Sequence, residues 1–236
     1  MLVFPYQFHA RNEILTMETL MDRRKFITGA SVAGAATLAA PAIARAETVS
    51  WKMTTAFPPG QPFYSKGPGS STDFAERVKA MSNGRMEIKV YHAGELVPAF
   101  QGFDAVRQGV VECNGWVSYF GAGKVPAAQF FGAVPFGMST QGQNAWLYSG
   151  DGIKLWHEVY DPLGLVAFPT GTTGVQMTGW FKKEINSLDD MKDLKLRIPG
   201  LAGKAYARLG VQVKVLPGGE IFPALERGVI DAAEWV

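Results

Sequence analysis

The sequence predicts an α/β fold arranged as two lobes, and three observations support this. Short runs in which apolar and polar residues alternate are typical of strands. Between them lie runs with apolar residues three or four positions apart, as in helices that pack on a sheet. The composition also changes near Pro169. We therefore expect residues 47–169 to form a first α/β lobe, and residues 170–236 to form a second, incomplete one.

The first lobe begins with a predicted β-α-β unit. Residues 48–55 alternate weakly and are stopped by a loop rich in proline and glycine, so we expect a strand there. Asp73 and Glu76 suit a capping box at the start of a helix that ends at the Asn-Gly pair 83–84. Residues 86–91 (MEIKVY) alternate as a second strand, which should lie parallel to the first after a right-handed crossover.

The remaining elements of the first lobe follow the same alternation. The run VVECNGWVSY (110–119) is almost continuously apolar, as in a strand buried at the centre of a sheet, and it ends at Tyr119. We further expect a helix, a short strand or crossover, a helix broken near its glycines and a final strand, at residues 99–109, 133–136, 143–160 and 166–169 respectively.

In the second lobe, the run LKLRIPG (194–200) alternates three apolar residues with two cations. This pattern predicts a half-buried strand with the apolar side chains inward and the cations outward. A turn and a short amphipathic helix follow. We also expect strands at residues 176–181, 211–216 and 230–236, and a helix at residues 220–228.

Two polar side chains lie where predicted strands end. Ligands of open α/β sheets bind beyond the carboxyl ends of strands, and a guanidinium there can grip a carboxylate through two parallel hydrogen bonds. Arg197 is therefore the leading candidate for a ligand contact, and the alternative is a solvated arginine on an exposed strand face. Tyr119 could offer its hydroxyl to a ligand or could pack as a wedge under a loop.

Residues 21–46 have the features of an export signal. Two adjacent arginines precede an apolar stretch rich in alanine and glycine, and a small-x-small sequence ends at Ala46. Because the arginines match the twin-arginine pattern, we expect export to the periplasm and cleavage after Ala46. A retained membrane anchor is the alternative. Residues 1–20 are expected to be an upstream extension, with the natural start at Met21.

Charge and cysteine content limit the classes of partner and linkage. The formal net charge is +2 with both signs interspersed, so no basic stripe suggests a nucleic-acid partner. Cys113 is the single cysteine, so the chain cannot form an internal disulfide. We expect a buried structural thiol, because no histidine lies near it to activate it.

The usual enzyme signatures are missing from the sequence. It has no G-x-S-x-G, no H-E-x-x-H and no second cysteine, and its three histidines lie in unrelated segments. Asp189 and Asp190 are adjacent and suit a helix cap better than acid–base chemistry. We therefore expect a binding protein and not an enzyme.

Several motifs occur together along residues 51–236: AGELVP (93–98), GVVEC (109–113), AVPF (133–136), GVQMTGWF (174–181), LKLRIPG (194–200), PGGE (217–220) and PALERGVIDAAEW (223–235). In this combination the chain resembles the DctP-type extracytoplasmic solute-binding proteins of TRAP transporters. Within these it is most similar to the branch that binds 2-oxo acids or lactate with a metal cation. The resemblance implies a two-lobed periplasmic binding protein fold of the type II-like class with a cleft between its lobes. Because family members continue for more than a hundred residues further, we expect the chain to be truncated at its C-terminus.

The resemblance also implies roles for individual residues. Arg197 corresponds to the anchor of the ligand carboxylate. Gln176, Glu234 and the backbone of Trp235 correspond to ligands of the cation, with Gln176 also beside the substrate. Amide and carboxylate oxygens suit hard cations such as sodium or calcium. Tyr119 matches the first residue of an aromatic run, which this chain continues with Phe-Gly-Ala instead. Without the resemblance, Gln176 could satisfy a strand edge and Glu234 could be a solvated strand-end carboxylate.

The expected function is therefore that of a receptor that captures a small monocarboxylate with a metal cation and delivers it to the membrane permease subunits of a TRAP transporter. No catalytic cofactor is expected, and a homodimer is one open arrangement. The alternatives are a periplasmic enzyme and an ABC-type receptor for a small carboxylate.

Overall fold

The computed structural model describes residues 1–5, 48–65 and 67–235. The predicted signal peptide lies outside these residues, as does most of the predicted upstream extension. The described chain contains two β-sheets with helices packed around them, so the α/β prediction is confirmed.

The first sheet has five strands in the order β3-β2-β4-β1-β5. They are β1 (Leu2–Pro5), β2 (Val49–Thr55), β3 (Met86–Tyr91), β4 (Cys113–Gly115) and β5 (Leu165–Phe168). Strand β2 pairs in parallel with β3 and β4, whereas β1 runs antiparallel between β4 and β5. The predicted β-α-β unit is confirmed, because a helix connects the parallel strands β2 and β3.

Helices cover this sheet and extend beyond it. They are α1 (Pro62–Ser65), α2 (Ser71–Met81), α3 (Gly102–Arg107), α4 (Thr140–Ser149) and α5 (Gly152–Tyr160), with the 3-10 turns η2 (Ser118–Gly121), η3 (Pro126–Phe131) and η4 (Asp161–Leu163). The break between α4 and α5 falls at Gly150, as the glycines predicted.

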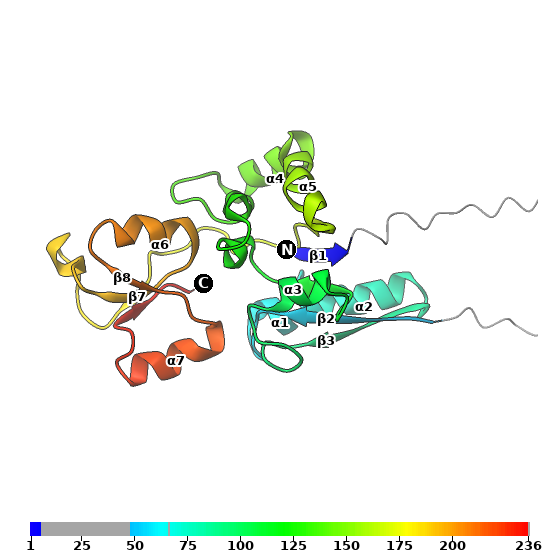
Figure 1. The fold of residues 1–236 in the computed structure, drawn as a ribbon, viewed down its shortest axis with the longest axis horizontal. Coiled ribbons are helices and arrows are strands. Elements are labelled where there is room, and N and C mark those ends of the chain that lie inside the picture. Colours follow the sequence, from blue (N-terminus) through cyan, green and yellow to red (C-terminus); the bar gives the residue numbers. More distant parts are fainter. Residues whose placement is uncertain (6–47, 66, 236) are drawn as a thin grey trace, which may run out of the picture.

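The second sheet has four strands in the order β6-β9-β7-β8. They are β6 (Trp180–Phe181), β7 (Lys195–Arg197), β8 (Gln212–Lys214) and β9 (Ala232–Ala233), with helices α6 (Gly200–Ala207) and α7 (Gly218–Glu226) and the turn η5 (Asp189–Met191). Strand β7 is central and pairs in parallel with β8 and β9. In Figure 1 this sheet lies on the left with α6 and α7, the first sheet lies on the right with α2 and α3, and α4 and α5 lie above.

Strand β1 is a finding that the sequence did not predict, because residues 1–20 showed no element. Leu2 and Val3 are buried at 3% and 0% exposure and belong to different hydrophobic clusters. Their alternating side chains thus bridge the two faces of the sheet. A run of four residues carries too little periodicity to be recognised as a strand from sequence alone.

The long strand predicted at residues 110–119 is wrong. Only Cys113–Gly115 pair as a strand, and Tyr119 lies in the 3-10 turn η2 instead of at a strand end. Beyond β4, Trp116 exchanges backbone hydrogen bonds with Met1, and its ring stacks on Phe103 with ring centroids 5.1 Å apart. The apolar run therefore reflects burial in the core, which is not restricted to strands.

The short strand or crossover predicted at residues 133–136 is a turn, and Phe136 there is exposed with a φ of +56°. Other predicted elements are present but shorter, because fewer residues find a pairing partner. The predicted strand at residues 176–181 contains only Trp180–Phe181. The predicted strand at 230–236 contains only Ala232–Ala233.

Helix α2 begins with a different cap from the one expected. The Ser70 hydroxyl accepts a hydrogen bond from the Asp73 backbone N–H at 3.3 Å. The Asp73 carboxylate in turn accepts one from the Gly69 N–H at 3.0 Å. The capping residue is therefore Ser70, three positions before Asp73, and the predicted pairing of Asp73 with Glu76 is wrong.

Replacing Ser70 with alanine should lower the free energy of unfolding by about 1 kcal/mol, because the N-terminal N–H groups of α2 lose their side-chain acceptor. Chemical denaturation followed by circular dichroism would measure this. Ser149→Ala, at the exposed end of α4, is the matched control and should change stability by less than about 0.5 kcal/mol. Equal losses in the two variants would contradict a capping role for Ser70.

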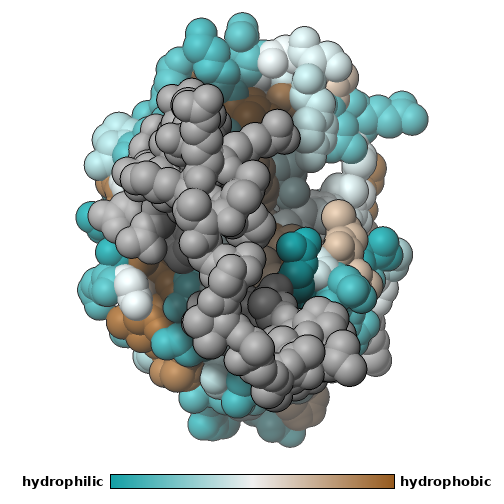
Figure 2. Space-filling view, turned by 90° about the vertical axis from the view of Figure 1, so that its right-hand side faces the viewer, coloured by the Kyte–Doolittle hydropathy of each residue, from teal (hydrophilic) through white to brown (hydrophobic). Residues whose placement is uncertain are grey.

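The single cysteine and the surface agree with a protein held together by a packed core. Cys113 is fully buried, and burial followed by the charge of Glu112 raises the pKa of its thiol. The expected structural thiol is thus confirmed. Figure 2 shows the side of the molecule that lies on the right in Figure 1. Hydrophilic residues cover much of the described surface there, with apolar residues in separate groups among them. None of the helices within the described ranges is long and apolar enough to cross a membrane.

Candidate functional site

Arg197 lies at the end of the central strand β7, and its side chain is only 1% exposed. Its strand neighbours Leu196 and Ile198 are also buried. Both faces of β7 are covered, so the prediction that its cations face outward is wrong for Arg197. The alternative of a solvated arginine is excluded as well, because the side chain has almost no contact with water. Its charge is instead hydrogen-bonded within the protein, as a buried charge requires.

The guanidinium of Arg197 is held by the chain on two of its three nitrogens. Its Nε donates to the carbonyl oxygen of Leu216 at 3.1 Å. Its Nη1 donates to the backbone oxygen of Glu234 at 2.8 Å and to the Glu234 carboxylate at 3.3 Å. Its Nη2 is buried and has no hydrogen-bond partner among the described residues. A buried donor without a partner is costly, and a planar guanidinium is suited to receive a carboxylate there.

The register of the second sheet brings Glu234 to this position. Strand β9 is parallel to β7 with Ala233 opposite Arg197, and the Glu234 N–H donates to the Arg197 carbonyl at 2.8 Å. The carboxyl ends of both strands therefore meet at one edge. Trp235 follows, and its ring lies 4.9 Å from the centre of the Arg197 guanidinium, within the range of a cation–π contact.

Gly218 makes room for this arrangement, and the sequence analysis did not identify its role. A Cβ atom at Gly218 would lie 2.6 Å from the ring of Trp235. The residue therefore has to be glycine if the ring is to stay over the guanidinium. The PGGE turn was noted as a motif, and its repeated glycines were the available signal.

Tyr119 belongs to the same cluster, although it lies in η2, in the segment of the chain that forms the first sheet. A Cβ atom at Gly200, the first residue of α6, would lie 3.1 Å from the Cβ of Tyr119. Burial, followed by the charge of Glu234, raises the pKa of the Tyr119 phenol to about 12, and Arg197 opposes this. Tyr119 therefore remains a neutral hydroxyl at physiological pH, and can donate a hydrogen bond.

Burial dominates the electrostatics of the ion pair. It lowers the pKa of the Arg197 guanidinium and raises that of the Glu234 carboxyl, while the attraction between the two groups opposes both shifts. Each group is thus the principal counter-ion of the other in a poorly solvated place.

Gln176 is not brought into contact with this cluster. It is exposed in a loop between the two sheets, and its side-chain amide nitrogen donates to the Thr173 hydroxyl at 2.5 Å. It nevertheless lines the same cavity as Arg197 and Glu234. The structure therefore brings together Tyr119, Arg197, Glu234 and Trp235, and places Gln176 elsewhere on the lining of the same cavity.

That cavity has a volume of about 2060 Å³ and is lined by elements of both sheets. Pockets that enclose a small ligand measure about 300–1000 Å³, so this space is an open cleft. The indole of Trp235, on its lining, donates to the Gln61 side-chain oxygen at 3.1 Å and so links the segments of the two sheets. Its walls are mainly apolar and aromatic, and Arg197 is a cation among them.

The donor groups around the cleft suit a hard cation. Within the described residues, no three or more His, Cys, Asp or Glu side chains lie together so that they could hold a metal ion. The oxygen donors on its lining include the Glu234 carboxylate and the Gln176 amide, and such oxygens with backbone carbonyls are typical ligands of sodium or calcium.

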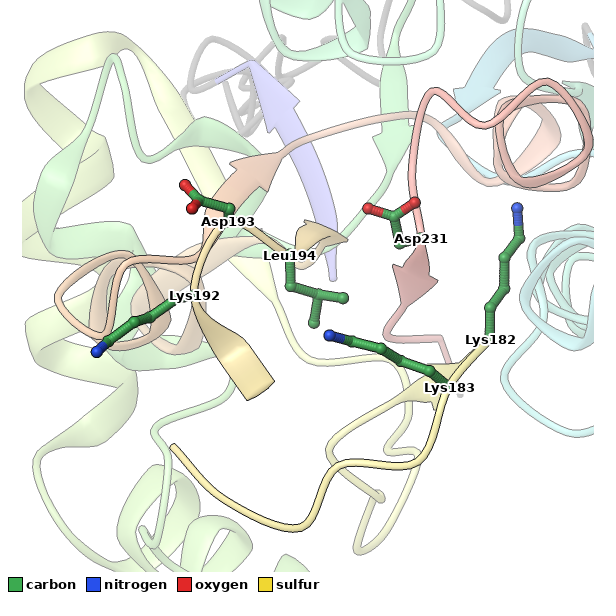
Figure 3. A pocket seen from close by; sticks show the side chains of 6 residues that line it. All are labelled: Lys182, Lys183, Lys192, Asp193, Leu194 and Asp231. Atoms are coloured by element: carbon green, nitrogen blue, oxygen red, sulfur yellow. The ribbon is translucent and has the colours of Figure 1, made fainter. Parts of the chain in front are cut away.

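A smaller cavity of about 290 Å³ is lined by three lysines and two aspartates, but it does not form an anion site (Figure 3). The ammonium groups do not converge on one point in Figure 3. Lys192 pairs with Asp189 at 2.7 Å, and Lys182 donates to the Leu225 carbonyl. Arg197 therefore remains the candidate for anion binding.

The comparisons with known proteins now decide the family. The model of the bacterial extracellular solute-binding protein family 7, DctP, matches residues 64–236. The chain belongs to this family. This is a family of solute-binding receptors, and together with the solved TRAP structures described below it confirms the resemblance expected from the motifs. The chain is 47% identical over 224 residues to the monocarboxylate 2-oxoacid-binding periplasmic protein of Nostoc sp. (strain PCC 7120), a match that covers 92% of this chain and 60% of the relative.

Solved DctP-type structures have the same fold. A TRAP periplasmic solute-binding protein from Pseudoalteromonas atlantica, with bound sodium and pyruvate, is 43% identical with a TM-score of 0.76 and matches 80% of this chain and 57% of that one. One from Bordetella bronchiseptica, a mixed-occupancy dimer with calcium and picolinate, is 40% identical with a TM-score of 0.77 and matches 80% and 56%. The predicted periplasmic binding protein fold is thus confirmed. The chain spans 60% or less of the length of these relatives.

Proposed function

We propose that this DctP-family chain is the receptor of a TRAP transporter that binds a small monocarboxylate, either a 2-oxo acid such as pyruvate or the 2-hydroxy acid lactate, with sodium or calcium. It would deliver the acid to the membrane permease subunits. The observation that carries the proposal is the buried Arg197 guanidinium at the cleft wall, whose Nη2 has no hydrogen-bond partner in the described chain. Support also comes from relatives 40–43% identical that hold pyruvate or picolinate with sodium or calcium.

In this proposal the acid carboxylate binds Arg197 and the Tyr119 hydroxyl donates a further hydrogen bond. The cation would be held by the side chains of Gln176 and Glu234 and the backbone of Trp235, and would attract the negative oxygens of the acid. Because the Gln176 amide donates to Thr173 and not to the Glu234 cluster, a rearrangement that brings Gln176 to Glu234 and Trp235 would be needed to complete the site. Tyr119, from the first lobe's segment, and Arg197, from the second's, would then both contact the acid.

The organisation of the whole protein is part of the same proposal. Residues 21–46 would be the twin-arginine signal that sends the chain to the periplasm. Residues 47–169 and 170–236 would form the two lobes, supported by the switch from the first sheet to the second between β5 and β6. A homodimer is supported by the dimer of the relative from Bordetella bronchiseptica.

Identification of the bound acid is the direct test. We expect denaturation of the purified protein to release a small monocarboxylate, identified by mass spectrometry, and calorimetry to detect binding of pyruvate or lactate. Incubation with an excess of the acid should return it chemically unchanged, since the chain would bind and not catalyse. Conversion of the acid would favour a periplasmic enzyme. Genes for one small and one large membrane subunit beside this gene would favour a TRAP receptor over an ABC-type one.

Removing the cation should weaken binding of the acid. If the cation contacts both the protein and the acid, their binding free energies are coupled reciprocally, typically by about fivefold or more. Calorimetry after exhaustive chelation, with elemental analysis as the check, should show this loss, and added calcium or sodium should restore affinity. Unchanged affinity in protein proven free of metal would mean that the acid is held by the protein alone.

A further inference from the structure

The Arg197 guanidinium already has an anionic partner supplied by the chain itself. The Glu234 carboxylate lies 3.3 Å from Nη1, and the two side chains are 13% and 1% exposed respectively. This pair is held in place by the backbone, because Glu234 also donates its N–H to the Arg197 carbonyl and accepts from Nη1 through its own carbonyl. The pair is therefore built into the register of β7 and β9.

The geometry of the fork makes this pair an obstacle to a ligand. A guanidinium grips a carboxylate through two parallel N–H groups, which come either from Nε with one Nη or from the two Nη atoms. The Nε is occupied by the Leu216 carbonyl at 3.1 Å. Binding at the other edge needs one N–H of Nη2, which has no partner in the described chain, and one of Nη1. The Nη1 atom already donates to Glu234 twice, to its carbonyl and to its carboxylate.

We propose that the Glu234 side chain occupies half of the acid site on Arg197 and must leave it before an acid can bind with both hydrogen bonds. Glu234 is then an internal competitor of the ligand. The proposal rests on the function proposed above, in which Arg197 anchors the acid.

The charges explain why a cation would be needed. One buried arginine can neutralise one carboxylate, but an acid beside Glu234 places two carboxylates against it. An uncompensated charge in so poorly solvated a site is strongly unfavourable. A cation that takes the displaced Glu234 carboxylate would free Arg197 and restore the balance. The cation would therefore act mainly by removing the competitor, and would bind before the acid or together with it.

Replacing Glu234 with glutamine tests this, because the amide has the same shape without the charge. In buffer free of sodium and calcium we expect Glu234→Gln to bind pyruvate or lactate about tenfold more tightly than the wild type. With calcium added, the wild type should gain affinity and the variant should not respond. Glu220→Gln, an exposed glutamate in the first turn of α7, is the matched control and should behave as wild type.

The outcomes separate this inference from the function on which it rests. If no acid binds to any of the proteins, the proposed function fails and the inference fails with it. If the wild type binds the acid but Glu234→Gln binds it no more tightly in cation-free buffer, only the inference is wrong. Wild-type affinity above that of the variant in cation-free buffer would make Glu234 a supporting residue and not a competitor.

A second measurement uses the wild type alone, so it tests the proposal even if the Glu234→Gln variant does not fold. In a crystal structure of the wild type with the acid bound, we expect both Nη atoms of Arg197 to donate to the acid and the Glu234 carboxylate to have left Nη1. A Glu234 carboxylate still within hydrogen-bond distance of Nη1, beside an acid bound on the same guanidinium, would overturn the proposal.

Discussion

Replacing Arg197 with lysine should weaken binding of the acid at least about tenfold, or ~1.5 kcal/mol. Lysine keeps the positive charge but loses the planar fork, so it cannot make two parallel hydrogen bonds to a carboxylate. It also cannot reach Leu216 and Glu234 with separate nitrogens, as the guanidinium does. The loss should therefore appear even though the net charge of the site is unchanged.

Calorimetry can distinguish lost binding from lost folding in this variant. A partly unfolded sample would bind fewer acid molecules per chain with normal affinity, whereas loss of the fork lowers the affinity at normal stoichiometry. Arg208→Lys, an exposed arginine just after α6, makes the same substitution outside the cleft and should bind as the wild type does. Normal affinity in Arg197→Lys would remove Arg197 as the anchor of the acid.

Replacing Gly102 with alanine should lower the free energy of unfolding by about 2 kcal/mol or more, because the added methyl group overpacks the core. A Cβ atom at Gly102 would lie 2.1 Å from the Asn114 side-chain oxygen and 2.9 Å from the Thr54 methyl carbon. All three residues are buried where α3 packs on the first sheet. Relief would require the side chain of Asn114 or the whole of α3 to move.

A double substitution tests whether Asn114 is the cause. The polar atoms of its side chain have no hydrogen-bond partner in the described part of the chain, so Asn114→Ala removes the obstacle without leaving a partner unsatisfied. The double variant Gly102→Ala/Asn114→Ala should recover part of the stability, as a coupling energy in denaturation experiments. Gly123→Ala, where a Cβ meets nothing within 4 Å, is the control. A Gly102→Ala variant as stable as this control would contradict the packing.

At the binding site, features that depend on residues close together in the chain were predicted correctly, and features that depend on residues far apart in the chain were not. The motif around Arg197 was recognisable because it spans only a few residues, and its family resemblance pointed to an anion anchor. That Arg197 is buried depends on β8 and β9, which come from later segments. Periodicity within one strand cannot report whether its second face will be covered, so the outward orientation was predicted wrongly.

Local signals also explain which elements were predicted well. Strand β3, the parallel pairing of β2 with β3 and the break between α4 and α5 follow from alternation and from glycines within short windows. Strand ends were unreliable where apolar residues continue past the strand, as Trp116 does between β4 and η2. The apolar side chain is buried in either case, so hydrophobicity alone cannot mark the residue where pairing stops.

By itself the sequence determined the α/β class, the β-α-β unit, the family and the residue types available for binding an acid. Only the tertiary structure decided that Glu234 pairs with Arg197 across 37 positions of sequence, that Gly218 leaves space for the ring of Trp235, and that Gln176 lines the cleft without joining this cluster. The physical reason is that periodicity and caps act between near neighbours in the chain. Charge pairing and packing act between groups that only the folded sheets bring together.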